Sequence, residues 1–242
     1  MDTSLQSSAE DRVIPRGTLP CAWDAFDAYL FDVDGTLLNC KDAVHYFAFC
    51  EALKALSGRE LNLDGVTAHG NTDIGILRDA LALAEIAESD WRPRLSDACS
   101  SMCSYVEKNR EQISTDALPA TREVLQHLRD REASLGIATG NLEAIGRIKL
   151  QSCGLLNYFD FHAFSDGLET RADVYNRALE QARNLAGQGA AICAFGDTPA
   201  DIRAARQHGI SIIAVATGIH SPEQLSAEQP DLCLSSLSDL LA

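Results

Sequence analysis

The sequence predicts an α/β fold, with a Rossmann-like parallel sheet, helices on both of its faces and a small inserted helical cap domain. Two observations predict it. Short apolar runs alternate with amphipathic helical segments along most of the chain, and one long interval near the N-terminus carries helical pattern alone. Strands that alternate with helices are joined by crossover connections, which produce a parallel sheet covered on both faces.

The expected strands are four short apolar runs, with a weaker fifth candidate around 232–234. Each of the four is followed by Asp, Thr or Gly and then by helical sequence, as is typical of buried strands in a parallel sheet. The four runs are 28–31, 134–138, 190–195 and 210–216. The helices expected between and after them cover 120–130, 142–153, 172–186 and 199–208.

The interval from about 41 to 116 contains no convincing strand. Apolar residues recur there at helical spacing near 44–52 and 74–84, Thr72 is a candidate cap for the second of these helices, and a third helical stretch covers 96–109. An ordinary crossover is far shorter. We therefore expect a flexible N-terminal tail of residues 1–20, a catalytic core of residues 21–40 and 117–242, and a helical cap domain of residues 41–116.

Charge and cysteine content narrow the classes of partner. The 242 residues include 20 Lys and Arg against 35 Asp and Glu, for a formal net charge of −15. Such a chain repels nucleic-acid phosphates and anionic lipids, so we expect neither nucleic acid nor membrane as a partner. Eight cysteines without a CxxC pair favour reduced thiols in the cytoplasm. The chain is expected to be a monomer or a homodimer.

Polar residues follow three of the predicted strands. DVDGT at 32–36 comes after the first, TGN at 139–141 after the second, and GDTPAD at 196–201 after the run that ends at 195. Parallel strands present their carboxyl ends at one edge of the sheet, so we expect four carboxylates and a hydroxyl to meet there. Such a cluster is costly unless a cation lies in it, and oxygen ligands favour Mg²⁺.

Two Asp residues separated by one residue suit phosphoryl transfer. Asp32 can face the substrate as nucleophile. Asp34 can protonate the leaving-group oxygen and afterwards activate water. Thr139 would hold a phosphoryl oxygen through its hydroxyl and the neighbouring backbone amides, while the metal neutralises charge as the phosphoryl group approaches.

Together the three motifs resemble those of the haloacid dehalogenase superfamily of hydrolases, and the resemblance covers the chain from about Ala25 onward. The inserted helices resemble the cap of the subgroup that includes phosphoglycolate phosphatase. The resemblance implies that Asp32 is the nucleophile and a metal ligand, and that Asp34 is the acid/base whose main-chain carbonyl also binds metal. It further implies metal ligation by Asp197 and, directly or through water, by Asp201. Phosphate binding is expected of Thr139, Gly140, Asn141 and Arg171.

One position departs from that family pattern, which usually has a Lys ahead of the last motif. We assign its role to Arg171, which keeps the charge and can form two bonds to a phosphate, with Lys149 as the alternative. Other polar residues of the interval 41–116 are expected to be non-catalytic or plain surface charges: His45, His69, Arg78, Arg92 and Arg94.

The expected function is Mg²⁺-dependent hydrolysis of a small organic phosphomonoester through an aspartyl phosphate on Asp32, with the cap closing over the substrate. Three alternatives remain. A dehalogenase of the same superfamily generally lacks an Asp at the position of Asp34, whereas a phosphomutase retains both Asp residues. A non-catalytic binding module could keep the fold, although a retained cluster of like charges has no structural benefit.

Overall fold

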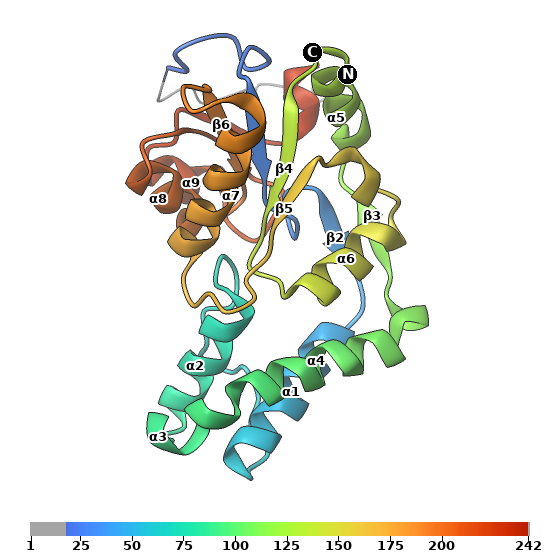
Figure 1. Cartoon of the computed structure of the whole chain (residues 1–242), viewed down its shortest axis with the longest axis vertical. Coiled ribbons are helices and arrows are strands. Elements are labelled where there is room, and N and C mark those ends of the chain that lie inside the picture. The colour runs from blue at the N-terminus through green and yellow to red at the C-terminus, as the bar shows by residue number, and fades with distance from the viewer. Residues whose placement is uncertain (1–17, 242) are drawn as a thin grey trace, which may run out of the picture.

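Six strands form one parallel sheet: β1 (Ala28–Phe31), β4 (Ser134–Ala138), β5 (Phe161–Ala163), β6 (Ile192–Gly196), β7 (Ser211–Val215) and β8 (Leu232–Leu234). The computed structural model describes residues 18–241, so residues 1–17 of the expected tail lie outside the described part. The strand order is β5-β4-β1-β6-β7-β8 (Figure 1). β1 lies between β4 and β6, where Tyr29 is opposite Leu135 and Cys193. The predicted α/β fold with a parallel sheet is confirmed.

The expected strands agree with this sheet except at one edge. Runs 28–31 and 134–138 coincide with β1 and β4, and the other three overlap β6, β7 and β8. The sequence pattern does not predict β5, because its three residues include the polar His162 and form no continuous apolar run. β8 has the same length and lies at the other edge of the sheet, but its Leu-Cys-Leu sequence is apolar throughout and was recognised as the weaker candidate.

A second difference is the antiparallel pair of β2 (Leu38–Cys40) and β3 (Thr115–Ala117), since β3 begins inside the interval read as free of strands. Leu38 is opposite Ala117, and each strand has three residues. This pair carries the chain out of the core after β1 and returns it before the next helix, so it fixes where the inserted helices begin and end.

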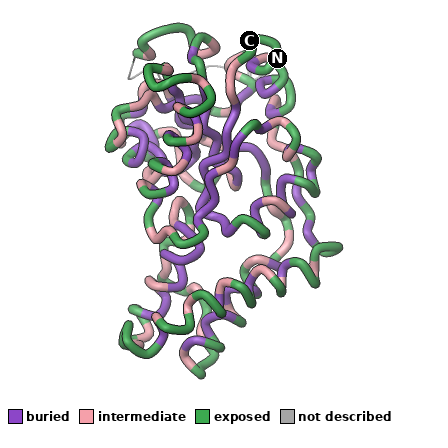
Figure 2. The backbone as a smooth tube through the Cα atoms, viewed as in Figure 1, coloured by how far each residue is buried: buried purple, intermediate pink, exposed green. Residues whose placement is uncertain are grey.

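Helices cover both faces of the sheet, and β1 divides its side chains between them. Tyr29 and Phe31 share an apolar cluster with α5 (Thr121–Asp130) and α6 (Glu143–Ser152). Ala28 and Leu30 share another with α7 (Arg171–Ala186), α8 (Pro199–Gln207) and α9 (Pro222–Ala227). Successive strand residues point to opposite faces. All four of these β1 residues are fully buried, and the strands form the buried centre of Figure 2.

Four helices between β2 and β3 bury a separate apolar cluster: α1 (Val44–Ser57), α2 (Asp73–Leu83), α3 (Glu88–Trp91) and α4 (Leu95–Lys108). We call them the cap helices. They lie at the end of the molecule opposite the two ends of the described chain (Figure 1). Thr72 caps α2 as expected, because its hydroxyl accepts a hydrogen bond from the Gly75 N–H at 2.9 Å. The cluster continues through Leu142, just before α6, and through Ile145 and Ile148 of α6, so the cap helices pack against the core.

The start of α2 also binds the loop that follows β4. The Asp73 N–H donates to the Gly140 carbonyl at 2.8 Å, and the Leu142 N–H donates to Asp73 Oδ2 at 2.8 Å. A Cβ at Gly140 would lie 2.0 Å from the Asn71 carbonyl oxygen, so only glycine permits this approach.

Short 3₁₀ turns complete the described chain at Arg92–Arg94, Arg110–Gln112, Leu156–Tyr158 and Leu237–Leu240. Within residues 18–241, no helix combines the length and the apolar character that crossing a membrane requires.

Candidate active site

A cavity of about 490 Å³ opens where the carboxyl ends of β1, β4 and β6 meet the start of α2. Asp32 follows β1, Thr139 follows β4 and Asp197 follows β6. Of the residues expected at the site, seven line this cavity: Asp32, Asp34, Thr139, Gly140, Asn141, Arg171 and Asp197. Asp201 lies behind the lining, with none of its surface exposed. The fold therefore brings the predicted residues together.

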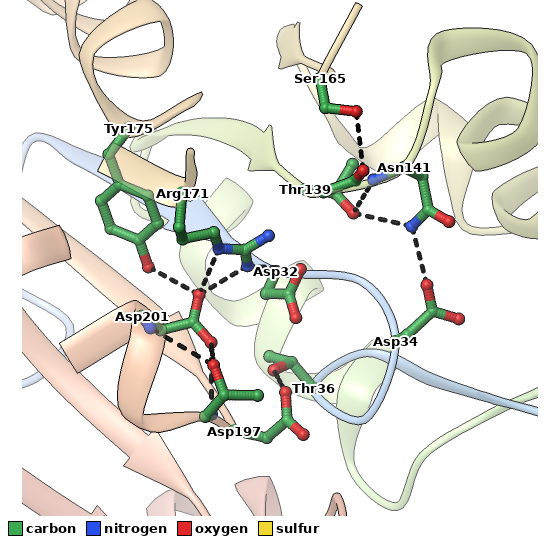
Figure 3. Close-up of polar contacts among 12 residues, drawn as sticks. Asp32, Asp34, Thr36, Thr139, Asn141, Ser165, Arg171, Tyr175, Asp197 and Asp201 are labelled. Atoms are coloured by element: carbon green, nitrogen blue, oxygen red, sulfur yellow. Dashed lines mark hydrogen bonds and ion pairs between the residues drawn. The ribbon is translucent and has the colours of Figure 1, made fainter. Parts of the chain in front are cut away.

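Arg171 connects two of the carboxylates. It is the first residue of α7, which Thr170 caps, and only 7% of it is exposed. Its Nη2 lies 2.6 Å from Asp32 Oδ1 and 2.5 Å from Asp201 Oδ1, and its Nε donates to Asp201 Oδ1 at 2.7 Å. Figure 3 shows the guanidinium between the two side chains. The structure thus places the cation beside the candidate nucleophile.

Three buried carboxylates share this part of the cavity. One oxygen from each of Asp32, Asp197 and Asp201 lies within 4.8 Å of the others. Burial raises the pKa of Asp32 to about 6, and the charge of Asp201 adds to this effect against the opposing charge of Arg171. Burial and the charges of Asp32 and Asp201 also raise the pKa of Asp197. One arginine is therefore too little positive charge for the cluster, and a bound divalent cation would supply the remainder.

The surroundings of Asp197 fit a hard cation. Its Oδ1 accepts a hydrogen bond from the Thr36 hydroxyl at 3.1 Å. A Cβ at Gly218 would lie 1.8 Å from Asp197 Oδ2, so the glycine leaves room that any side chain would fill. Carboxylate oxygens that are buried, close together and partly free of protein donors form a ligand set of the kind that Mg²⁺ takes. The donor set therefore fits the expected metal.

Asp201 also caps a helix, as isolated Asp residues often do. Its Oδ2 accepts hydrogen bonds from the Thr198 hydroxyl at 2.6 Å and the Thr198 N–H at 3.2 Å, which caps α8. Its Oδ1 accepts from Arg171 and from the Tyr175 hydroxyl at 3.2 Å. Protein donors thus bind both of its oxygens. Asp201 is therefore better placed to contact a metal through water than directly.

Asp34 belongs to a different group of side chains. Its Oδ2 accepts a hydrogen bond from Asn141 Nδ2 at 2.7 Å, and Lys149 Nζ lies 2.9 Å from both of its oxygens. Lys149 also donates to Asn141 Oδ1 at 2.9 Å. Burial favours the neutral acid, but Lys149 and Asn141 outweigh it and hold the pKa of Asp34 below its usual range. In Figure 3 the Asp34 carboxylate points toward Asn141 and away from Arg171.

The contacts of Lys149 are the part of the site that sequence reasoning missed. Its side chain is 5% exposed, on the face of α6 that also buries Ile145 and Ile148. The signal was present, because a lysine on the apolar face of a helix requires a buried anion as partner. The spacing of the motifs did not indicate which anion that was. Lys149 contacts Asp34, whereas the candidate nucleophile Asp32 has Arg171.

Thr139 and two histidines of the cap region lie around the same cavity. Thr139 Oγ1 accepts hydrogen bonds from Asn141 Nδ2 at 2.8 Å and from the Asn141 N–H at 3.3 Å. His45 and His69 both line the cavity, and His45 Nε2 lies 3.3 Å from Asp73 Oδ2. The three cap arginines do not line it: Arg78 and Arg92 form ion pairs with Glu169, and Arg94 donates to carbonyls that include those of Ala55 and Leu56.

Comparison with known proteins decides the family. Residues 29–215 match the family described as haloacid dehalogenase-like hydrolase. The chain belongs to this family. The superfamily resemblance of the three motifs is thereby confirmed, and the chain is a hydrolase.

Relatives within the haloacid dehalogenase-like family align along almost the whole chain. The phosphoglycolate phosphatase of Synechococcus elongatus is 34% identical, over 88% of this chain and 95% of its own. A Dickeya dadantii protein named "Probable phosphatase IndB" is 27% identical, over 88% and 90%. The crystal structure of a hydrolase from Pseudomonas syringae is 23% identical and covers 88% of this chain and 95% of its own, with a TM-score of 0.63. That structure shows the same fold.

Proposed function

We propose that this protein is a Mg²⁺-dependent phosphatase that hydrolyses a small organic phosphomonoester through an aspartyl phosphate on Asp32. The observation that carries the proposal is the position of Asp32. It is buried beside Arg171 at the carboxyl end of β1, in one cavity with Asp197 and Thr139. The names of the two curated relatives, both phosphatases, support the reaction class.

The metal would be held by Asp32, by Asp197, by the main-chain carbonyl of Asp34 and, through water or directly, by Asp201. When bound, Mg²⁺ neutralises the carboxylates and the charge of the transferring phosphoryl group. The raised pKa values of Asp32 and Asp197 support this assignment, because both carboxylates lack sufficient positive charge without a cation.

The reaction would take place in two displacements. In the first, an Asp32 oxygen attacks phosphorus, the ester P–O bond breaks, and Asp34 gives a proton to the departing alcohol. In the second, Asp34 takes a proton from water as that water attacks phosphorus, and the bond to Asp32 breaks to release phosphate. Thr139 and the backbone amides of Gly140 and Asn141 would hold the phosphoryl oxygens throughout. Lys149 stabilises the ionised form of Asp34 that the second displacement needs, while the anionic phosphoryl group of a bound substrate would favour the protonated form that the first displacement needs.

The division of the chain is part of the same proposal. Residues 41–116 would act as a cap over the cavity of a core formed by residues 21–40 and 117–242, and the separate apolar cluster of α1–α4 supports this. We place the protein in the cytoplasm, as a monomer or a homodimer, with a phosphorylated metabolite as its partner. Eight free thiols support a reducing compartment.

The direct test is phosphate release from p-nitrophenyl phosphate by the purified full chain. We expect release with Mg²⁺ and none after EDTA treatment. A phosphomutase would instead return the phosphoryl group to a sugar phosphate, so free phosphate at one equivalent per nitrophenol separates hydrolysis from transfer. No phosphate release from this or other phosphomonoesters would contradict the proposal.

Arg171→Ala is expected to lower kcat by about 10²- to 10³-fold, the scale of losing one preorganised charge contact. Arg171→Lys should recover part of this loss because it restores the charge. Since Arg171→Ala leaves Asp32 and Asp201 without their buried partner, the change should also cost about 3–5 kcal/mol of stability. Kinetics and thermal unfolding with saturating Mg²⁺ check both effects, and Arg183→Ala on the same helix is the control. A folded Arg171→Ala variant with wild-type kcat would disprove the role.

Lys149→Met is expected to keep the fold, because Met fits the apolar face of α6, and to lower kcat by about 10- to 100-fold through misplacement of Asp34. Lys149 is here a positioning residue for the acid/base. The loss should be larger for alkyl phosphates, whose leaving oxygen needs a proton, than for p-nitrophenyl phosphate. Arg147→Met, on the exposed side of α6, is the matched control. Wild-type kcat on every ester, or a loss that is larger for p-nitrophenyl phosphate than for alkyl phosphates, would refute a role through Asp34.

A further inference from the structure

The cavity extends beyond the candidate phosphoryl site to the cap helices. There its wall contains Phe49 of α1 and Ile76 of α2, which are 4% and 5% exposed. His45 stacks on Phe49, with 4.7 Å between the ring centroids. This wall is where the organic part of a phosphomonoester would lie once its phosphoryl group is at Asp32. Its chemistry therefore selects the alcohol that leaves.

The wall offers no free ammonium or guanidinium group. Among the described residues that line the cavity, only Lys149 and Arg171 carry such groups. Lys149 makes three contacts, two with Asp34 and one with Asn141. Arg171 contacts Asp32 and Asp201. Both cations are thus paired with side chains of the reaction centre, and Arg78, Arg92 and Arg94 make their contacts outside the cavity.

The wall does contain a buried anion. Asp73 is 3% exposed and lines the cavity at the start of α2. His45 Nε2 lies 3.3 Å from Asp73 Oδ2, so a protonated His45 would form a neutral pair with Asp73 and leave no net positive charge. A carboxylate on the substrate would lie in the same cavity as the Asp73 carboxylate, and among the described lining residues no lysine or arginine is free to pair with it. Like charges brought together in this way are strongly disfavoured.

We infer that the substrate's organic part is uncharged, with an apolar portion against Phe49 and Ile76 and room for a hydroxyl beside His45. This inference rests on the proposed function and names its substrate class: monophosphates of neutral alcohols, with carboxylated and bisphosphorylated esters excluded. A cavity of about 490 Å³ is large enough for an alcohol of several carbons or an aromatic ring. The Synechococcus elongatus relative is named for phosphoglycolate, whose organic part is a carboxylate. Apart from the imidazoles of His45 and His69, the described residues that line the cavity provide no unpaired cationic side chain for that group.

Matched pairs of esters test the inference. Each pair shares a carbon skeleton and differs in whether one carbon is a hydroxymethyl or a carboxylate group: 2-hydroxyethyl phosphate with 2-phosphoglycolate, glycerol 3-phosphate with 3-phosphoglycerate, and 4-(hydroxymethyl)phenyl phosphate with 4-carboxyphenyl phosphate. With the full chain and Mg²⁺, we expect kcat/KM to favour the uncharged member of each pair by at least about 10-fold. Equal or higher kcat/KM for the carboxylated members would overturn the inference.

A designed cation supplies the converse test. Ile76→Lys should place an ammonium group in the wall and shift the ratio within each pair toward the carboxylated ester by about 10-fold, whereas Ile76→Met, of similar length, should not. An unchanged ratio in a folded Ile76→Lys variant would also count against the inference. p-Nitrophenyl phosphate separates the two claims. If it is hydrolysed but the pairs show no preference, the substrate class alone is wrong; if no ester is hydrolysed, the proposed function fails and the inference fails with it.

Discussion

Asp32→Asn is expected to reduce phosphate release by at least about 10⁴-fold, because an amide cannot form the acyl phosphate and is a weaker metal ligand. The variant should fold normally. The pKa of Asp32 is raised to about 6 in the folded protein, so the group is ionised at pH 7 but its ionisation costs the folded protein more than the unfolded chain. The folded protein is most stable where Asp32 is protonated, and this part of the free energy of unfolding is lost as the pH rises through that value. A neutral Asn avoids this cost, so Tm in metal-free buffer at pH 7 should equal or exceed that of the wild type.

The matched control for Asp32→Asn is Asp130→Asn, which makes the same chemical change at an exposed site at the end of α5. It should leave both kcat and Tm close to the wild-type values, since the Asp130 side chain accepts a surface hydrogen bond from Gln126. Normal turnover by a folded Asp32→Asn variant would eliminate Asp32 as nucleophile. A loss of activity accompanied by a large fall in Tm would indicate a structural role instead.

Removal of the metal is expected to abolish activity, and Mg²⁺ should restore it. Ca²⁺ should inhibit, because it accepts more oxygen ligands in looser geometry and can engage both oxygens of the nucleophile. Binding can also be followed without turnover. Mg²⁺ should raise the Tm of the wild type, since a ligand that binds only the folded state stabilises it.

Asp197→Asn provides the comparison for the metal experiment. The change removes one charge from a buried ligand, so the Mg²⁺-induced rise in Tm should become smaller and a higher Mg²⁺ concentration should be needed for residual activity. Asp130→Asn should respond to Mg²⁺ as the wild type does. Full activity of the wild type in EDTA, or an identical Mg²⁺-induced shift in Asp197→Asn, would contradict the metal assignment.

Local sequence pattern was sufficient for the sheet wherever a strand is buried on both faces. β1 and β4 appear at the residues expected from their apolar runs, because strands covered on both faces read as continuous hydrophobic sequence. The strands β2, β3 and β5 have three residues each and include polar ones, so they form no continuous apolar run, unlike the equally short Leu-Cys-Leu of β8. Their pairing depends on neighbours distant in sequence, such as Leu38 with Ala117, which periodicity does not reveal.

For the site, too, some features could be predicted from local sequence, and others depend on contacts between residues distant in sequence. Motif positions at the ends of strands indicated that Asp32, Thr139 and Asp197 would meet, because the sheet topology alone requires it. Motif positions did not indicate the partner of each charged side chain. Lys149 pairs with Asp34, 115 residues away in sequence, and only the packing of α6 beside the first loop determines that contact. Both Arg171 and Lys149 were candidates for one role, and the structure gives each a different carboxylate.

The central claim is that the phosphoryl group passes through Asp32, and its most direct test is to find the group there. Wild-type protein and Asp34→Asn, which should slow hydrolysis of the intermediate by removing the base, would be mixed with Mg²⁺ and p-nitrophenyl phosphate, quenched in acid during turnover, digested and mapped by mass spectrometry. We predict a phosphoryl group on Asp32, at higher occupancy in Asp34→Asn. A phosphoryl group on another residue, or none in either protein while nitrophenol is released, would contradict the mechanism.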